Sequence, residues 1–404
     1  MSYQEKYLKY KKKYLALKNQ LGGNWICPVC KEDNEDSRPT CIKMACSGQR
    51  PVAVAPDTAE LAERVFGHTG LGSGINIFPY LKNKEAASMR LVNKKMKDTV
   101  DRHWTNLPSE IAGEFVLSIG SVGTGLGQFK SPYGLSLTPD ETQLLVCDAG
   151  NSRVVVADAH DGRSLHELRG PVGTLDLPCQ AVVVPHTKQV LVLDMMRCVI
   201  VVFTSVNDET VLRTLGDGEG QGPRQLIGPC GLAVLDGNTA APVAVVADKF
   251  NHRLVLFQVN DGTLVGHVGS RGTAYGQFKH PSAVSVLTRD NEDLLVVADS
   301  GNHRVQVLTR TGAVLQVLLG NQDIIFDKTF NGITVHIESG EVLVTEKDRV
   351  VSLRLSDGKL RVVCGGARGS GNGEFAQPNG VVTSINNTQL WVADSHNNRL
   401  CLFR

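Results

Sequence analysis

"DSGNHRVQVL", at residues 299–308, recurs in close variants along the chain, and this recurrence decides the fold. The closest copies are "DAGNSRVVVA" from Asp148, "DKFNHRLVLF" from Asp248 and "DSHNNRLCLF" from Asp394. More divergent copies fill the gaps, namely "DMMRCVIVVF" from Asp194 and "EKDRVVSLRL" from Glu346. Successive acidic residues are therefore 46, 54, 51, 47 and 48 positions apart, and this period is typical of β-propeller blades.

Each repeat contains short apolar runs separated by polar turns, which predicts four antiparallel strands per unit. The last copy has room for only three strands before Arg404, whereas "EFVLSIGS" at 114–121 matches the fourth strand of the other units. We expect residues 114–121 to pair beside residues 400–404, which closes the ring and removes its exposed edges. The sequence thus predicts a mainly β protein, with a six-bladed propeller over residues 114–404.

Two of the repeats, "ADSGNHRVQVL" and "ADSHNNRLCLF", resemble NHL repeats. This resemblance implies a platform that recognises target proteins or RNA in ubiquitin ligases and translational repressors, although some related propellers are enzymes. The expected inner strands offer Ser, Ala, Val, Thr and Gly, without the recurring carboxylates that would hold a metal on the axis. We therefore expect no catalytic residue, and a propeller lyase or hydrolase is the least favoured reading.

Composition and charge limit the class of protein. Hydrophobic residues make up 42% of the chain, glycine is abundant at 41 residues, and aromatic residues are only 5%, which suits many tight turns. We expect no membrane span and no secretory signal, and hence an intracellular, cytoplasmic protein with reduced or metal-bound cysteines. Residues 114–404 carry 24 basic and 29 acidic side chains, and this acidic balance weakens a general nucleic-acid interpretation.

The repeat turns and the loops between blades are expected on one face of the ring. Acidic, Asn and Arg side chains of the regular turns are interpreted as structural, because they can hold turns and loops together. In the second and fifth units Arg moves to the third position after the acidic residue, as Arg197 and Arg349. This pattern reflects either a duplicated three-blade unit or a target-binding groove. The groove would use the two arginines as anchors, with apolar contacts from Met195, Met196, Ile324, Ile325 and Phe326.

Residues 24–50 contain four closely spaced cysteines, Cys27, Cys30, Cys41 and Cys46. Four thiolates suit one structural, tetrahedral zinc ion whose binding would fold a segment too short for its own core. The stretch resembles the Ran-binding-protein type of zinc finger, which implies a partner surface at Trp25, Asn34 and Arg38 and binding to ubiquitin or single-stranded RNA. It departs from that pattern because its second cysteine pair is C-x4-C, and because Lys31-Glu32 replaces the Thr-Phe of ubiquitin binders.

Residues 57–104 show apolar spacing that predicts two short helices. "IFPYL", "RLVNKKMKDTV" and the Trp that follows resemble the F-box, although the usual Leu-Pro opening is absent. The resemblance implies docking on an Skp-type adaptor and a cullin through Phe78, Leu81, Leu91 and Val92.

Residues 1–23 form an expected basic amphipathic helix with six Lys and one Glu. This segment resembles the N-terminal segments of many giant DNA virus proteins, which would place the chain in a host cytoplasm. Taken together, the modules predict the substrate-recognition subunit of a cullin-type ubiquitin ligase, with the propeller binding the target protein. The alternative is an RNA-binding regulator that uses the zinc finger and the propeller.

Overall fold

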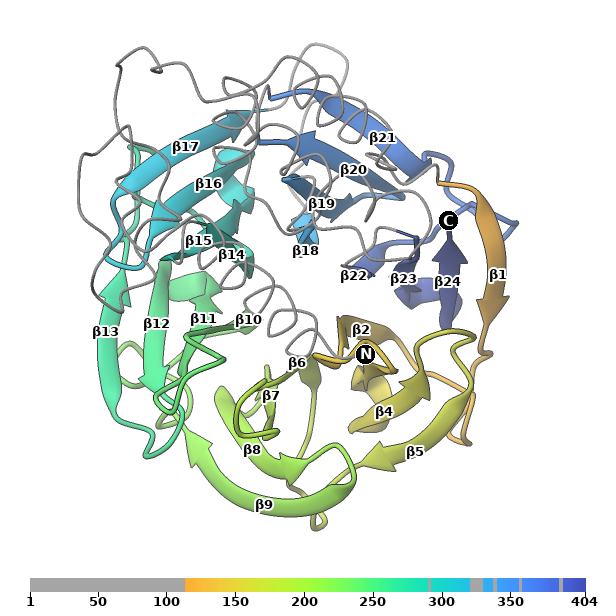
Figure 1. Ribbon diagram of the computed structural model, residues 1–404, viewed down its shortest axis with the longest axis horizontal. Helices are drawn as coiled ribbons and strands as arrows, with labels where there is room; N and C mark the ends of the chain where they lie inside the picture. The colour runs from red at the N-terminus through yellow and green to blue at the C-terminus, as the bar shows by residue number, and fades with distance from the viewer. Residues whose placement is uncertain (1–112, 290–291, 320–329, 337–339, 356–357, 385–387) are drawn as a thin grey trace, which may run out of the picture. The chain divides into compact units, whose positions relative to one another are not determined.

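The computed structural model describes residues 113–289, 292–319, 330–336, 340–355, 358–384 and 388–404. Within these residues the regular secondary structure consists of 24 β-strands and four short 3-10 turns. The strands form six antiparallel sheets of four strands each, and these sheets surround a central axis as the blades of a propeller (Figure 1). The six-bladed propeller expected from the repeat is confirmed.

Blade 1 comprises β2 (Pro132–Leu137), β3 (Gln143–Asp148), β4 (Arg153–Asp158) and β5 (Ser164–Leu168). Blade 2 comprises β6 (Pro178–Val183), β7 (Val190–Asp194), β8 (Val199–Ser205) and β9 (Asp208–Leu215). Blade 3 comprises β10 (Pro229–Leu235), β11 (Val243–Asp248), β12 (Arg253–Gln258) and β13 (Leu264–Val268). Blade 4 comprises β14 (Pro281–Arg289), β15 (Glu292–Asp299), β16 (Arg304–Thr309) and β17 (Val314–Leu319).

Blade 5 comprises β18 (Phe330–His336), β19 (Glu341–Glu346), β20 (Arg349–Arg354) and β21 (Leu360–Gly365). Blade 6 combines the two ends of this part of the chain in the order β22 (Pro378–Thr383), β23 (Leu390–Asp394), β24 (Arg399–Phe403) and β1 (Phe115–Ile119). The 3-10 turns are Ala149–Asn151, Lys249–Asn251, Ser300–Asn302 and Ser395–Asn397, and each joins the second and third strands of its blade.

The ring is closed by β1, which pairs antiparallel with β24 (Figure 1). Phe115 lies opposite Phe403 and Ser118 lies opposite Cys401. The backbone beyond β24 continues this pairing, because Glu114 and Arg404 exchange both of their N–H···O bonds at 2.8 and 2.9 Å. β1 therefore covers the edge of β24, which would otherwise present unpaired backbone groups.

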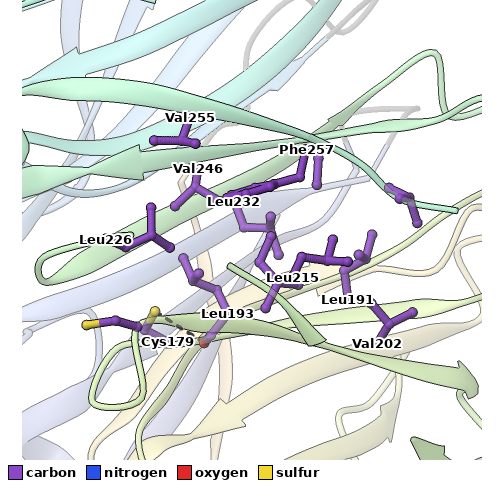
Figure 2. Packing of buried hydrophobic residues seen from close by; sticks show 14 of the residues in the cluster. Cys179, Leu191, Leu193, Val202, Leu215, Leu226, Leu232, Val246, Val255 and Phe257 are labelled. Carbon is purple, nitrogen blue, oxygen red and sulfur yellow. Dashed lines mark hydrogen bonds between the residues drawn. The ribbon is translucent and has the colours of Figure 1, made fainter. Parts of the chain in front are cut away.

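Six hydrophobic clusters fill the spaces between neighbouring blades. Figure 2 shows the cluster between blades 2 and 3, where Leu193 and Leu215 from one blade meet Leu232 and Phe257 from the next. The two middle strands of a blade contact both neighbours, so β11 is buried along its whole length, whereas the outer β13 alternates between exposed and covered residues. This explains why the middle strands have continuous apolar sequences, whereas apolar and polar residues alternate in the outer strands.

Candidate recognition face

Each repeat turn begins with an acidic residue at the end of the second strand of its blade. All six carboxylates are fully buried, namely Asp148, Asp194, Asp248, Asp299, Glu346 and Asp394. In blades 1, 3, 4 and 6 the carboxylate pairs with the Arg that begins the third strand, at N–O distances of 2.7 to 2.9 Å. The structural interpretation of these turn residues is therefore confirmed.

Blade 4 shows how this pair holds the loop that leads into the blade. Asp299 accepts a hydrogen bond from the amide of Lys279 at 2.7 Å, while Arg304 donates from Nε to the same carboxylate. The two Nη atoms of Arg304 donate to three loop carbonyls, those of Thr273, Ala274 and Gln277. Because these hydrogen bonds join the turn to the loop at several points, the two form one rigid unit on this face.

The glycine-rich loops are also anchored by an apolar side chain. Phe129, Phe278 and Phe375 occupy the same place in three loops and are fully buried, and Leu226 takes this place in blade 3. Gly269 has a φ of +83°, and a Cβ at this position would lie 2.3 Å from the Phe278 ring. The glycine of each "GQF" and "GEF" motif also has a positive φ, of +76 to +78°, and the phenylalanine of each motif is buried. Backbone conformation and packing therefore explain these motifs.

In several blades the last residue of the repeat turn adopts the left-handed conformation and joins its blade to the next one on this face. His252 has a φ of +58° and its Nδ1 accepts a hydrogen bond from the amide of His280 in the next blade, at 3.0 Å. Asn398 likewise accepts from the amide of Ser131 at 2.9 Å. These side chains bridge the blades, so the turns keep their positions around the ring.

The two irregular turns are not equivalent in the structure. Arg349 lies opposite Glu346 in the strand register and donates to its carboxylate from Nε at 2.8 Å. This is the register position that Arg304 holds opposite Asp299 in blade 4. Blade 5 simply has a turn that is two residues shorter, so Arg349 takes the structural place that Arg304 has in blade 4. The irregular turns of blades 2 and 5 are therefore different in structure, and they no longer support descent from a duplicated three-blade unit. The role of Arg349 as a charged anchor for a target stays a prediction.

Blade 2 departs in a different way. Val199 lies opposite Asp194 in the strand register, so the position that carries Arg in the regular blades carries no charge here. Arg197 lies within the turn, is exposed, and donates to the carbonyl of Gly173. Met196 beside it is 63% exposed, whereas Met195 is half-buried against the core between blades 2 and 3. Met196 and Arg197 are therefore the predicted groove residues that the described structure presents at the surface.

Other predicted site residues lie outside the described residues. These are Ile324, Ile325 and Phe326 of the groove, the cysteines 27, 30, 41 and 46, the zinc-finger surface at Trp25, Asn34 and Arg38, and the F-box-like residues Phe78, Leu81, Leu91 and Val92. The expected helix at 1–23 also lies outside them.

The repeat turn of blade 3 carries a functional signal that the repeat alignment overlooks. Gly occupies the second turn position in blades 1 and 4, as Gly150 and Gly301, but Phe250 occupies it in blade 3. The Phe250 ring is 53% exposed and lies against Gly228, where a Cβ would approach the ring to 2.6 Å. The ammonium group of Lys249 lies 5.7 Å from the centroid of this ring. An exposed aromatic ring beside a cation is typical of a binding surface.

The innermost strands line a cavity of about 370 Å³ on the propeller axis. Its polar groups include Ser136 and Gln180, which are bonded to backbone carbonyls, and the hydroxyl-bearing Tyr133. Burial raises the pKa of Cys230 to about 11, with the nearby Lys249 opposing this rise. The thiol is therefore protonated at neutral pH and is a poor nucleophile. Among the described residues, no group of three or more His, Cys, Asp or Glu is placed to hold a metal ion.

Comparison with known proteins identifies the repeat. Residues 278–308 and 375–403 match the NHL repeat family. Each segment spans a loop phenylalanine, a buried aspartate and its arginine partner, so the NHL signature coincides with the loop-holding network described above.

Two solved structures are similar to the chain at low sequence identity. The chain is similar to a protein of unknown function from Bacteroides thetaiotaomicron, with 14% identity, a TM-score of 0.51, and coverage of 73% of this chain and 74% of that one. It is also similar to Kuenenia stuttgartiensis hydrazine synthase, with 13% identity, a TM-score of 0.48, and coverage of 70% and 78% respectively. No curated protein sequence matches the chain. Within the described residues, no helix is long and apolar enough to cross a membrane.

Proposed function

We propose that the chain is the target-recognition subunit of a cullin-type ubiquitin ligase, in which the NHL propeller binds the target protein. Residues 57–104 would dock on an Skp-type adaptor and so connect the target to the cullin. The proposal joins the interaction scaffold to the F-box-like sequence, and it assigns no catalytic residue to this chain.

One observation of the structure carries the recognition part of this proposal. On the face that holds the repeat turns, buried carboxylates fix the turn backbones. In blade 3 Asp248 pairs with Arg253, and in blade 2 Asp194 accepts hydrogen bonds from three backbone amides. A few side chains project from these turns. These are the exposed Met196 and Arg197 of blade 2 and the exposed Phe250 of blade 3. Exposed side chains on a rigid backbone lose little conformational entropy on binding, which favours specific recognition.

The adaptor is tested by co-purification. We expect an Skp-type adaptor and a cullin to co-purify with the full chain, and to be lost when Phe78→Ala and Leu81→Ala are combined. Circular dichroism and thermal melting establish that the variant is folded, and the double variant Met196→Ala with Arg197→Ala is the matched control that keeps the adaptor. Failure of the wild-type chain to retain an adaptor from its own host would contradict the ligase assignment.

The surface of blade 2 is tested separately. We expect Met196→Ala with Arg197→Ala to weaken target binding by about tenfold, because two exposed contacts are removed. The melting temperature should change little, since surface substitutions usually alter stability by about 0.5 kcal/mol or less. Binding is measured by titration against the target that co-purifies with the wild-type chain. If the double variant binds the target with unchanged affinity, the recognition site lies elsewhere on the propeller.

The zinc finger supplies a second interaction module in this proposal. Four thiolates would hold one zinc ion, and we expect elemental analysis to find about one zinc per chain, in line with a closed structural site. Cys27→Ser or Cys41→Ser should abolish this zinc while the propeller still melts at the wild-type temperature. Cys198→Ser, a change within the propeller, is the control that should keep the metal. A zinc-free wild-type chain prepared without chelator would refute the site.

RNA binding is the second candidate function. The observation in its favour is the exposed Phe250 ring with the Lys249 ammonium beside it, since nucleic-acid bases stack on aromatic rings while cations contact the phosphates. In this case Trp25 and Arg38 of the zinc finger would add a second contact. The acidic balance of residues 114–404 opposes an extended electrostatic interface.

A further inference from the structure

A second cavity, of about 280 Å³, opens between blades 3, 4 and 5. It lies where the repeat turns of blades 3 and 4 meet the first strand of blade 5. The lining side chains that bear on its chemistry are Lys249, Lys279, His280, Ser300, His303 and Asn331. Three separate blades contribute to it, so the propeller ring itself assembles this cavity.

The two lysines provide uncompensated positive charge. Within the part of the chain that the structure describes, neither Lys249 nor Lys279 forms an ion pair with a carboxylate. The nearest buried acids are already neutralised, because Asp248 pairs with Arg253 at 2.9 Å and Asp299 pairs with Arg304 at 2.7 Å. Among the residues that line the cavity, the two lysines therefore supply two positive charges and no carboxylate opposes them.

The backbone that carries these lysines is rigid. Lys279 is fixed at both backbone groups: its amide donates to Asp299 at 2.7 Å, and its carbonyl accepts from the amide of Gly301 at 2.7 Å. In the turn of blade 3, the amide of Phe250 donates to the carbonyl of Ile227 at 3.1 Å. The positions of both lysine Cα atoms are thus set before a ligand arrives, which reduces the entropy cost of binding.

His280 adds a neutral hydrogen-bonding group. Its ring stacks at 4.7 Å from the ring of His252, and its ring nitrogens have no hydrogen-bond partner among the described residues. Burial lowers the pKa of His280, and the positive charges of Lys249, Lys279 and Arg271 lower it further. The same two lysines that help to lower this pKa would attract an incoming anion.

We propose that this cavity binds the phosphoryl group of a phosphorylated serine or threonine in the target protein. A phosphomonoester carries close to two negative charges at neutral pH and offers three acceptor oxygens, which matches two ammonium groups and an imidazole. A single carboxylate would leave one lysine uncompensated. The inference rests on the proposed role of the propeller in target recognition and specifies the chemistry of the target.

The surroundings favour a peptide over RNA as the carrier of this group. An RNA strand presents a phosphate at every nucleotide and requires a continuous basic track. The place of Lys279, whose amide donates to the turn carboxylate, is taken by Asp176 in blade 2, Ile227 in blade 3 and Ala376 in blade 6, so lysines do not continue around the ring. Next to the cavity, the exposed Phe250 ring lies 5.7 Å from the His280 ring. It would contact an apolar side chain that follows the phosphorylated residue.

The test uses the full chain and an immobilised phosphoserine and phosphothreonine peptide library, with the same library after phosphatase treatment as reference. We expect the wild-type chain to select phosphorylated peptides, and Lys249→Gln with Lys279→Gln to bind the selected peptide about 100-fold more weakly, about tenfold for each lysine. Melting temperatures should match, since neither lysine forms an ion pair.

Lys130→Gln is the matched control. Lys130 occupies the place of Lys279 in blade 1, where its amide donates to Asp148 at 2.7 Å and its carbonyl accepts from Gly150 at 2.8 Å. Its turn partners in blade 6 are Ser395 and His396 rather than a second lysine, so this change should leave binding intact. If Lys130→Gln weakened peptide binding as much as the double lysine variant does, the effect would be one of general charge, and the proposal of a specific site would be overturned.

Three further outcomes would overturn the proposal. These are equal binding of the phosphatase-treated library, full binding by the double lysine variant, and displacement of the selected peptide by a uridine-rich 15-nucleotide RNA that binds more tightly, which would assign the cavity to RNA. The adaptor would dock through residues 57–104 and not through the cavity, so it should still co-purify with the double lysine variant. Failure of the phosphoryl site can therefore be distinguished from failure of the ligase assignment.

Discussion

Arg304→Ala is expected to destabilise the propeller by about 3–5 kcal/mol, because it removes one partner of a buried ion pair and leaves the other uncompensated. Asp299 is fully buried, and the Arg304 side chain is only 6% exposed. Three loop carbonyls also lose their donor. The melting temperature should fall on the order of 10 °C for a domain of this size, as measured by calorimetry or circular dichroism.

Two control variants locate the cause of this loss. Arg197→Ala removes an exposed arginine from the equivalent turn of blade 2 and should leave the melting temperature nearly unchanged. Arg304→Lys keeps the charge opposite Asp299 but cannot reach three carbonyls with one ammonium group, so its stability should lie between wild type and Arg304→Ala. If Arg304→Ala and the wild-type chain have the same melting temperature, the ion pair and hydrogen bonds of Arg304 do not hold the blade together.

Removal of the closing strand should have the other large effect. A chain that begins at Ser121 lacks β1, so β24 becomes an exposed edge and Phe403 loses its contact with Phe115, at 5.7 Å between ring centroids. We expect this chain to aggregate, because unpaired edge strands recruit other chains. Size-exclusion chromatography with light scattering measures the outcome.

A chain that begins at Pro108 is the matched control, because Pro108–Arg404 forms one compact unit that retains β1. It should elute as a monomer and unfold cooperatively. A monomeric chain from Ser121 with the same melting temperature would show that the ring does not depend on closure by β1.

Much of the fold could be predicted from the sequence because its determinants are local. The acidic residue at each repeat turn and the Gly-rich loops are short motifs, and their period of about 50 residues fixes the number of blades. The apolar runs that fill the core clusters are equally visible. The match of "EFVLSIGS" to other fourth strands pointed to β1, which pairs with β24 in the structure.

The candidate site was predictable only in part. Alignment of the turns on their acidic residue counted positions without gaps, so it placed Arg349 together with Arg197. The structure separates them, because a turn shortened by two residues brings Arg349 opposite Glu346, while Arg197 stays within its turn. Sequence spacing measures distance along the chain, whereas the ion pair depends on strand register.

The sequence by itself determined the repeat, the number of blades and the structural role of the Asp and Arg pairs, since each follows from a motif of about ten residues. The tertiary structure alone decided which exposed side chains lie together. Lys249, Lys279 and Asn331 are far apart in the chain, yet they line one cavity because neighbouring blades bring their turns and loops to the same face. Such proximity arises from the packing of whole sheets, and no local pattern in the sequence encodes it.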